Sequence, residues 1–117
     1  MTDQKVFVAG HRGMVGSSVV KKLKSLGYNN IITRTRSALN LTDSARVSRF
    51  FKKNSPDVVI LCAAKVGGIL ANNTYRGDFI YENLMISSNI IKSAHDSGVK
   101  KLINLGSSCI YPKDSKI

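Results

Sequence analysis

The sequence has 117 residues, 43% of them hydrophobic, and this length suits one domain with a single core. Its 18 Lys and Arg residues against 7 Asp and Glu residues give a formal net charge of +11, which attracts phosphate-bearing partners. The basic residues are scattered and not interleaved with stacking aromatics, so a solvated basic face is favoured over nucleic-acid binding. Without a leader pattern, a membrane-length apolar run or a C-x-x-C pair, we expect a cytoplasmic protein with no membrane partner and no metal site.

Short apolar runs alternate with amphipathic segments from the N-terminus onward. Residues 5–9, KVFVA, end at Gly10 and are typical of a buried strand in a parallel sheet. Residues 14–26 carry apolar side chains at helical spacing, and Gly27 follows where a helix should end. Residues 31–33 predict a second strand.

The middle of the chain predicts another helix before a third long apolar run. Residues 39–41 are a candidate for a very short extra strand, and Thr42 or Asp43 is suited to cap the helix that follows. The apolar face of that helix is formed by Val47, Phe50 and Phe51. Residues 58–63, VVILCA, predict a strand covered on both faces.

The last third of the chain repeats the same alternation. Residues 79–97 carry Ile80, Leu84, Ile86, Ile90, Ile91 and Ala94 at helical spacing, and residues 101–105 predict a final strand. The fold class is therefore α/β: a Rossmann-like, doubly wound parallel sheet of about five strands with helices on both faces.

Ligands of such sheets bind beyond the carboxyl ends of the strands. Four segments follow predicted strands in this way, namely residues 10–16, 34–36, 64–68 and 107–109. We expect these segments to converge on one crevice.

Three glycines at G-x-x-G-x-x-G spacing separate the first strand from the first helix. Gly10 permits a tight turn, Gly13 lets the backbone approach a pyrophosphate, and Gly16 lets the helix pack close to the sheet. Their placement predicts a dinucleotide-binding loop made of Gly10, His11, Arg12, Gly13, Met14, Val15 and Gly16.

The segment after the second strand reads TRTRS and contains no acidic residue. Enzymes that use the unphosphorylated cofactor usually place Asp or Glu there to hold the ribose hydroxyls. A guanidinium instead suits a 2′-phosphate, so Arg34 or Arg36, assisted by Arg12, favours NADP(H) over NAD(H). Two solvated surface arginines are the alternative.

Small nucleophilic side chains follow the last predicted strand. At the edge of a cofactor crevice, at least one of Ser107, Ser108 and Cys109 is a candidate for a catalytic role, although small polar residues are also common at strand ends. Cys62, by contrast, sits in an apolar run and is interpreted as a buried core thiol.

The segments GHRGMVG, RTRSALNLTD, AAKVGGILANN and LGSSCIYP occur in register. With them the sequence closely resembles the N-terminal part of the GDP-L-fucose synthases, a family of extended short-chain dehydrogenases/reductases, over essentially all its residues. The resemblance implies an NADPH-dependent conversion of GDP-4-keto-6-deoxy-D-mannose to GDP-L-fucose, by epimerisation at C3 and C5 and hydride delivery to C4. It also implies a GDP-sugar substrate and a homodimer for the full-length family.

The same resemblance assigns roles to individual residues. It makes Ser107 the residue that orients the substrate carbonyl and Cys109 an acid/base in the epimerisation. Beyond the glycine loop, it places cofactor contacts on Arg36, Ser37, Ala38, Leu39, Asn40 and Leu41, on Ala64 and Lys65, and on Leu105, Gly106 and Ser108.

The sequence departs from the family because it contains no Tyr-x-x-x-Lys pair. Its tyrosines are followed four places on by Ile32, Phe79, Met85 and Ser115. The family's histidine partner for the cysteine and its substrate domain are also missing. We therefore expect residues 1–117 to be an incomplete N-terminal NADP-binding domain with little or no turnover alone; a non-catalytic binding module and a nucleic-acid-associating remnant are the alternatives.

Overall fold

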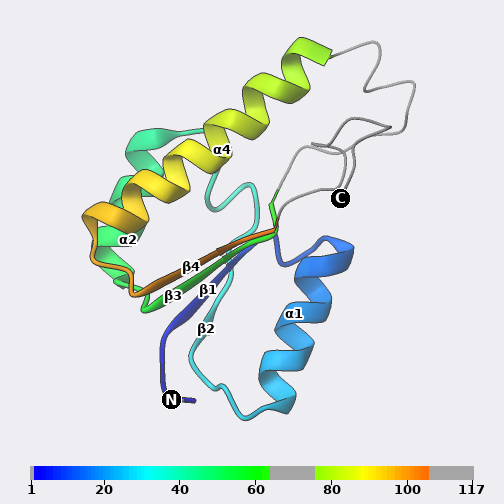
Figure 1. Ribbon diagram of the computed structural model, residues 1–117, viewed down its shortest axis with the longest axis vertical. Coiled ribbons are helices and arrows are strands. Elements are labelled where there is room, and N and C mark those ends of the chain that lie inside the picture. The colour runs from blue at the N-terminus through cyan, green and yellow to red at the C-terminus, as the bar shows by residue number, and fades with distance from the viewer. Residues whose placement is uncertain (1, 64–75, 106–117) are drawn as a thin grey trace, which may run out of the picture.

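The structure is a computed structural model that describes residues 2–63 and 76–105. Its described strands, β1 (Val6–Ala9), β2 (Ile31–Ile32), β3 (Val58–Leu61) and β4 (Lys101–Asn104), form one parallel sheet in the order β2-β1-β3-β4 (Figure 1). The helices are α1 (Met14–Ser25), α2 (Ser44–Asn54) and α4 (Arg76–Asp96). This architecture confirms the predicted Rossmann-like α/β fold.

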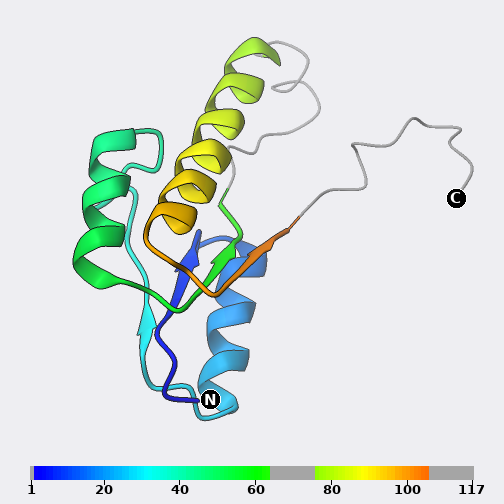
Figure 2. The same ribbon diagram turned by 60° about the vertical axis from the view of Figure 1, so that its left-hand side comes forward.

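The sheet is covered on both faces: α1 lies on one side, and α2 and α4 lie on the other (Figures 1 and 2). Because successive side chains of a strand point to opposite faces, β1 divides its residues between the two sides. Val6 and Val8 pack in a cluster with the apolar side chains of α1, whereas Phe7 and Ala9 belong to the cluster on the α2 and α4 side. Burial on both faces explains why β1 and β3 read as unbroken apolar runs, whereas β4 is mostly exposed.

The larger core lies on the α2 and α4 side. Phe7 of β1 meets Phe50 of α2 at a ring-centroid distance of 4.5 Å and Phe51 edge-on at 5.9 Å. Such tilted aromatic contacts are favourable beyond the area they bury. The α2 face predicted from the sequence, Val47, Phe50 and Phe51, is thus confirmed as a core face.

Residues 39–41, the candidate extra strand, do not form one, so the described residues contain four strands where about five were expected. Local turns occupy this backbone instead: the N–H of Leu39 donates to Thr35 O at 2.9 Å, and the N–H of Asp43 donates to Asn40 O at 3.0 Å. Leu39 turns inward and is only 6% exposed. An apolar residue here signals a buried loop and not a sheet pairing.

Of the two candidate caps of α2, Asp43 is the residue that caps it. Its Oδ1 accepts a hydrogen bond from the backbone N–H of Arg46 at 3.2 Å. The hydroxyl of Thr42 donates instead to Asn40 Oδ1 at 2.7 Å and stabilises the preceding loop. A carboxylate in this position both satisfies a free N–H and complements the positive end of the helix.

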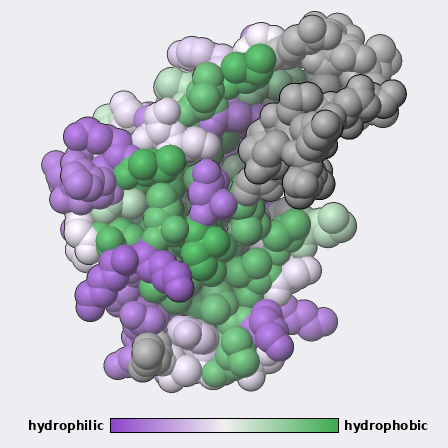
Figure 3. All heavy atoms as spheres, in the orientation of Figure 1, coloured by the Kyte–Doolittle hydropathy of each residue, from purple (hydrophilic) through white to green (hydrophobic). Residues whose placement is uncertain are grey.

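The apolar positions of α4 divide into a buried stripe and an exposed one. Ile86, Ile90 and Ala94 are buried against the sheet, whereas Ile80 and Leu84 are more than half exposed. Figure 3 shows hydrophobic side chains at the surface over α4. Among the described residues, no helix has both the length and the apolar character needed to cross a membrane.

The strand order creates a switch point at the centre of the sheet. From β1 the chain passes through α1 to β2 on one side, and it then returns through α2 to β3 on the other side of β1. β1 and β3 pair from Val6↔Val58 to Ala9↔Leu61, so their carboxyl ends are level. Ligands of open α/β sheets bind at such a point.

Candidate functional site

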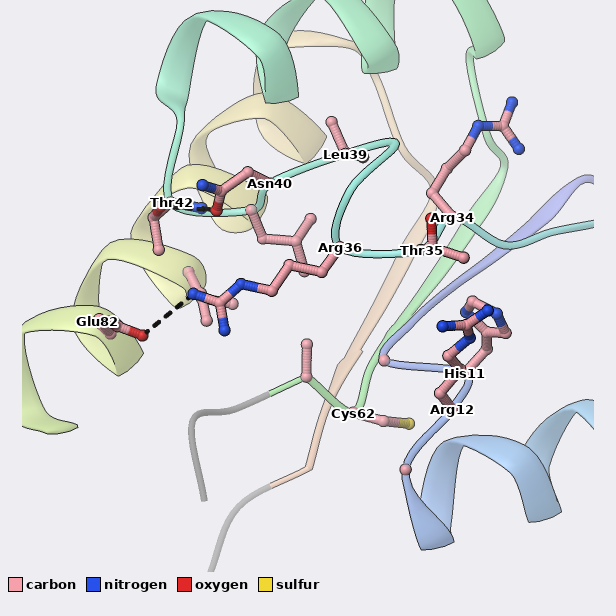
Figure 4. Close-up of a pocket in the computed structure, with 15 residues that line it drawn as sticks. His11, Arg12, Arg34, Thr35, Arg36, Leu39, Asn40, Thr42, Cys62 and Glu82 are labelled. Atoms are coloured by element: carbon pink, nitrogen blue, oxygen red, sulfur yellow. Dashed lines mark hydrogen bonds and ion pairs between the residues drawn. The ribbon is translucent and has the colours of Figure 1, made fainter. Parts of the chain in front are cut away.

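A pocket of about 260 Å³ lies at this switch point (Figure 4). It is lined by residues 10–13 after β1, residues 34–36 and 39–42 after β2, Cys62 and Ala63 after β3, and Glu82 and Ile86 of α4. The expected convergence is confirmed for the first two predicted segments. Residues 64–68 and 107–109 lie outside the described residues.

Gly10 and Gly16 are required by the fold itself. Gly10 has φ +88°, and a Cβ there would lie 2.7 Å from the backbone N and Cα of Ala63. A Cβ on Gly16 would collide with the carbonyl oxygen of Gly10. These two glycines allow the turn to lie against the end of β3 and α1 to pack against the turn.

Gly13 meets no such restriction, because the nearest atom to an added Cβ is Gly10 O at 3.6 Å. Gly13 is the N-cap of α1, no side chain caps this end, and the first turn has no acidic residue. The first-turn N–H groups of a helix have no partner within the helix, and they favour an anion. The glycine loop therefore offers backbone donors at the edge of the pocket.

The two arginines after β2 point in different directions (Figure 4). The Arg34 guanidinium lies 5.3 Å from the centroid of the Phe50 ring and donates to Thr33 O at 2.8 Å. Arg36 extends across the pocket towards α4, where its Nη2 lies 3.8 Å from Glu82 Oε2. Arg36 is thus the better placed of the two to meet a ligand in the pocket.

Cys62 lies differently from its prediction as a buried core thiol. It is half-buried, packs against the α1-side core and lines the pocket. Burial raises the pKa of its thiol above the ordinary value of 9.0, which favours the neutral form. Its apolar run indicated the strand correctly but not that the strand ends one residue before it.

The remaining predicted site residues are unevenly placed. His11, Arg12, Leu39, Asn40 and Leu41 line the pocket, whereas Met14, Val15, Ser37, Ala38 and Leu105 do not. Ala64, Lys65, Gly106, Ser107, Ser108 and Cys109 lie outside the described residues. Within the part of the chain that the structure describes, no group of three His, Cys, Asp or Glu side chains is arranged to hold a metal ion.

Glu82 and Ile86 line the pocket, although the sequence pointed to neither of them as a site residue. They lie one turn apart on α4, and only the packing of that helix over the sheet brings them to the site. Cys62 and Ala63 were easier to identify from the sequence than Glu82 and Ile86, because both directly follow an apolar strand.

The chain is similar to a known protein family and to named relatives over nearly all of its length. The model of the NAD dependent epimerase/dehydratase family matches residues 6–117. The chain is 58% identical to GDP-L-fucose synthase of Escherichia coli (strain K12) and 59% identical to GDP-L-fucose synthase 1 of Arabidopsis thaliana, and these matches cover 99% and 97% of this chain. It spans 36% of the length of each of these curated relatives.

Among solved structures, the chain is similar to a GDP-D-glycero-L-gluco-heptose synthase from Campylobacter jejuni, determined in the presence of NADPH. The TM-score is 0.95 at 41% identity, and the match covers 99% of this chain and 34% of the other.

Proposed function

The chain belongs to the NAD dependent epimerase/dehydratase family, and on that premise we propose that it forms the cofactor-binding part of an NADP(H)-dependent epimerase and reductase of GDP-linked sugars. One observation carries this proposal. The uncapped N-terminus of α1 and the Arg36 guanidinium both border one pocket at the switch point of the sheet. These groups suit the two phosphate-bearing regions of NADP(H), the pyrophosphate and the 2′-phosphate.

The residues of the pocket fit this cofactor. The backbone of Gly10 and Gly13 and the first turn of α1 would hold the pyrophosphate. Arg36 would hold the 2′-phosphate, since residues 33–42 contain no carboxylate that would favour ribose hydroxyls. Leu39, Asn40 and Leu41 line the same side of the pocket and would border the adenosine.

The chemistry proposed for the longer protein follows from the relatives and the resemblance. NADPH, when bound, supplies a hydride for reduction of a keto group at C4 of a GDP-linked sugar. We assign Ser107 to orienting the substrate carbonyl and Cys109 to moving protons in the epimerisation, because proton removal next to a keto group needs a base with a pKa near the working pH. A homodimer and a cytoplasmic location belong to the same proposal.

The 117 residues contain no tyrosine followed four places on by lysine. We propose that this stretch by itself binds the cofactor but turns over the keto sugar slowly or not at all. Oxidation of NADPH by the purified chain at ordinary enzyme rates, on the order of 10 s⁻¹, would contradict this part of the proposal.

The two arginines after β2 provide a matched test of the cofactor assignment. Replacing Arg36 with Ala is expected to raise the Kd for NADPH by about 10- to 100-fold, because it removes a charge-assisted contact to the 2′-phosphate. Binding of NADH should change by less than about twofold, since it lacks that phosphate.

Arg34 also lines the pocket, but its guanidinium lies over Phe50, so Arg34→Ala is the control for loss of the same charge. It should change the Kd for NADPH by less than about threefold. Equal effects of the two substitutions would contradict the assignment of the 2′-phosphate to Arg36. Calorimetric titration of the wild-type chain and both variants with each nucleotide measures these differences.

A further inference from the structure

One face of α4 is directed at the loop that follows β2. Glu82, Ile86 and Asn89 lie at positions i, i+4 and i+7 of the helix and therefore share one face. Glu82 and Ile86 line the pocket. Asn89 donates a hydrogen bond from Nδ2 to the carbonyl oxygen of Leu41 at 2.9 Å, although 48 residues separate the two.

This face binds the loop at two places. Asn89 holds the Leu41 end, and Glu82 pairs with Arg36 near the other end, with 3.8 Å between Glu82 Oε2 and Arg36 Nη2 (Figure 4). The loop between these points carries the groups assigned to the adenosine and the 2′-phosphate. The position of α4 therefore determines how the loop presents those groups.

The two side chains of the ion pair differ in how far they are exposed to solvent, and therefore in rotamer freedom. The Arg36 side chain is 75% exposed, whereas the Glu82 side chain is only 25% exposed. A long exposed side chain loses rotamer freedom when it binds a ligand, and this loss reduces affinity. A carboxylate fixed on a helix limits that freedom in advance and leaves other N–H groups of the guanidinium for a phosphate.

We propose that Glu82 is a positioning residue that increases selectivity for the 2′-phosphorylated cofactor by holding Arg36 across the pocket. This proposal rests on the proposed function. Glu82 comes from α4 and its negative charge faces the Arg36 guanidinium. It thus differs from the carboxylate at the end of β2 that holds ribose hydroxyls in enzymes specific for the unphosphorylated cofactor.

The test compares the Kd values of NADPH and NADH for the wild-type chain, Glu82→Ala and Glu82→Gln. Ala is the best helix former and keeps α4 intact. Glu82→Ala should raise the Kd for NADPH by about fivefold, the effect of one ion pair, and that for NADH by less than about twofold. Glu82→Gln keeps the length of the side chain but removes its charge, so it should raise the Kd for NADPH by a similar factor.

Two further variants separate positioning from a general structural role. In an Arg36→Ala background, Glu82→Ala should have no additional effect on NADPH binding, because Glu82 acts through Arg36. Asp96→Asn removes another carboxylate of α4. Asp96 does not line the pocket, and its Oδ2 lies 3.2 Å from Lys92 Nζ, so this substitution should change neither Kd.

Unchanged selectivity in Glu82→Ala, parallel weakening of both nucleotides, or tighter binding of NADPH would each overturn the role of Glu82. Those results leave the proposed function intact as long as the wild-type chain prefers NADPH. If the wild-type chain binds neither nucleotide, the proposed function itself fails, and the role of Glu82 fails with it.

Discussion

At the level of single residues, the three glycines of the loop have different physical reasons to be glycine. Gly10 and Gly16 are required because a Cβ at either position would meet backbone atoms of the fold. Gly13 has room for a Cβ and borders the pocket. The spacing predicted the tight turn at Gly10 and the close packing at Gly16, but not the contact with Ala63, because that contact depends on how the turn packs against the end of β3.

Gly13→Ala should therefore separate binding from folding. The thermal midpoint of unfolding is expected to stay near that of the wild-type chain, while the Kd for NADPH rises by about tenfold or more, because a methyl group would stand where the pyrophosphate approaches. Gly16→Ala is the matched comparison and should lower the thermal midpoint, since its Cβ collides with Gly10 O. A Gly13→Ala chain with undiminished affinity would show that the loop does not hold the pyrophosphate.

The raised pKa of Cys62 predicts that the stability of the chain depends on pH. Burial raises the pKa of its thiol above 9.0, so the folded chain holds this proton more tightly than the unfolded chain does. The neutral Cys62 thiol contributes fully to the free energy of unfolding at pH values below its pKa in the unfolded chain. This contribution is lost as the pH rises through its pKa in the folded chain.

In a Cys109→Ser chain, alkylation of Cys62 by iodoacetamide at pH 8 should be slower in the native state than in denaturant, and it should accelerate as pH increases. NADPH should slow the reaction further, because Cys62 lines the pocket. Equal rates in native and denatured chains would contradict this prediction.

At the level of elements, the apolar runs of β1 and β3 were predictable because both faces of these strands are buried, which leaves a continuous signal in the sequence. The candidate strand at residues 39–41 is absent for the opposite reason. Leu39 is buried by a loop whose backbone bonds are local, and a short apolar segment does not distinguish this from a strand. The buried and exposed stripes of α4 likewise depend on which neighbours cover the helix.

The hydrogen bond between Asn89 and Leu41 yields a prediction at this level. Asn89→Ala should lower the free energy of unfolding by about 1 to 2 kcal/mol, because it leaves a partly buried carbonyl oxygen without its donor. The exposed neighbour Ser88 supplies the control, and Ser88→Ala should change stability by less than about 0.5 kcal/mol. Urea denaturation followed by circular dichroism measures both; matching losses would show that the bond does not anchor the loop.

At the level of the whole molecule, the site combines residues that the sequence separates widely. The ends of β1 and β2 were predictable contributors, because glycines and arginines follow those strands directly. Glu82, Ile86 and Asn89 were not, since only the packing of α4 on the sheet brings them near residues 36–41. The assignment of the catalytic residues Ser107 and Cys109 stays a prediction from the resemblance.

The net charge of +11 supplies the competing explanation for any affinity towards nucleotides. Binding driven by charge alone weakens steeply with salt, on the order of 10³-fold between about 50 and 200 mM for a nucleic acid held by several phosphate contacts. A pocket that holds one cofactor through backbone N–H groups and a single arginine should lose much less affinity over the same range.

The most direct measurement is a calorimetric titration of the purified 117-residue chain with NADPH and with NADH, each at 50 and 200 mM salt. A folded cofactor site predicts saturable binding of one NADPH per chain, at least about tenfold tighter than binding of NADH, with the preference kept at the higher salt concentration. Equal binding of the two nucleotides that disappears at 200 mM salt, or no binding of either, would contradict the assignment of an NADP(H) site to this chain.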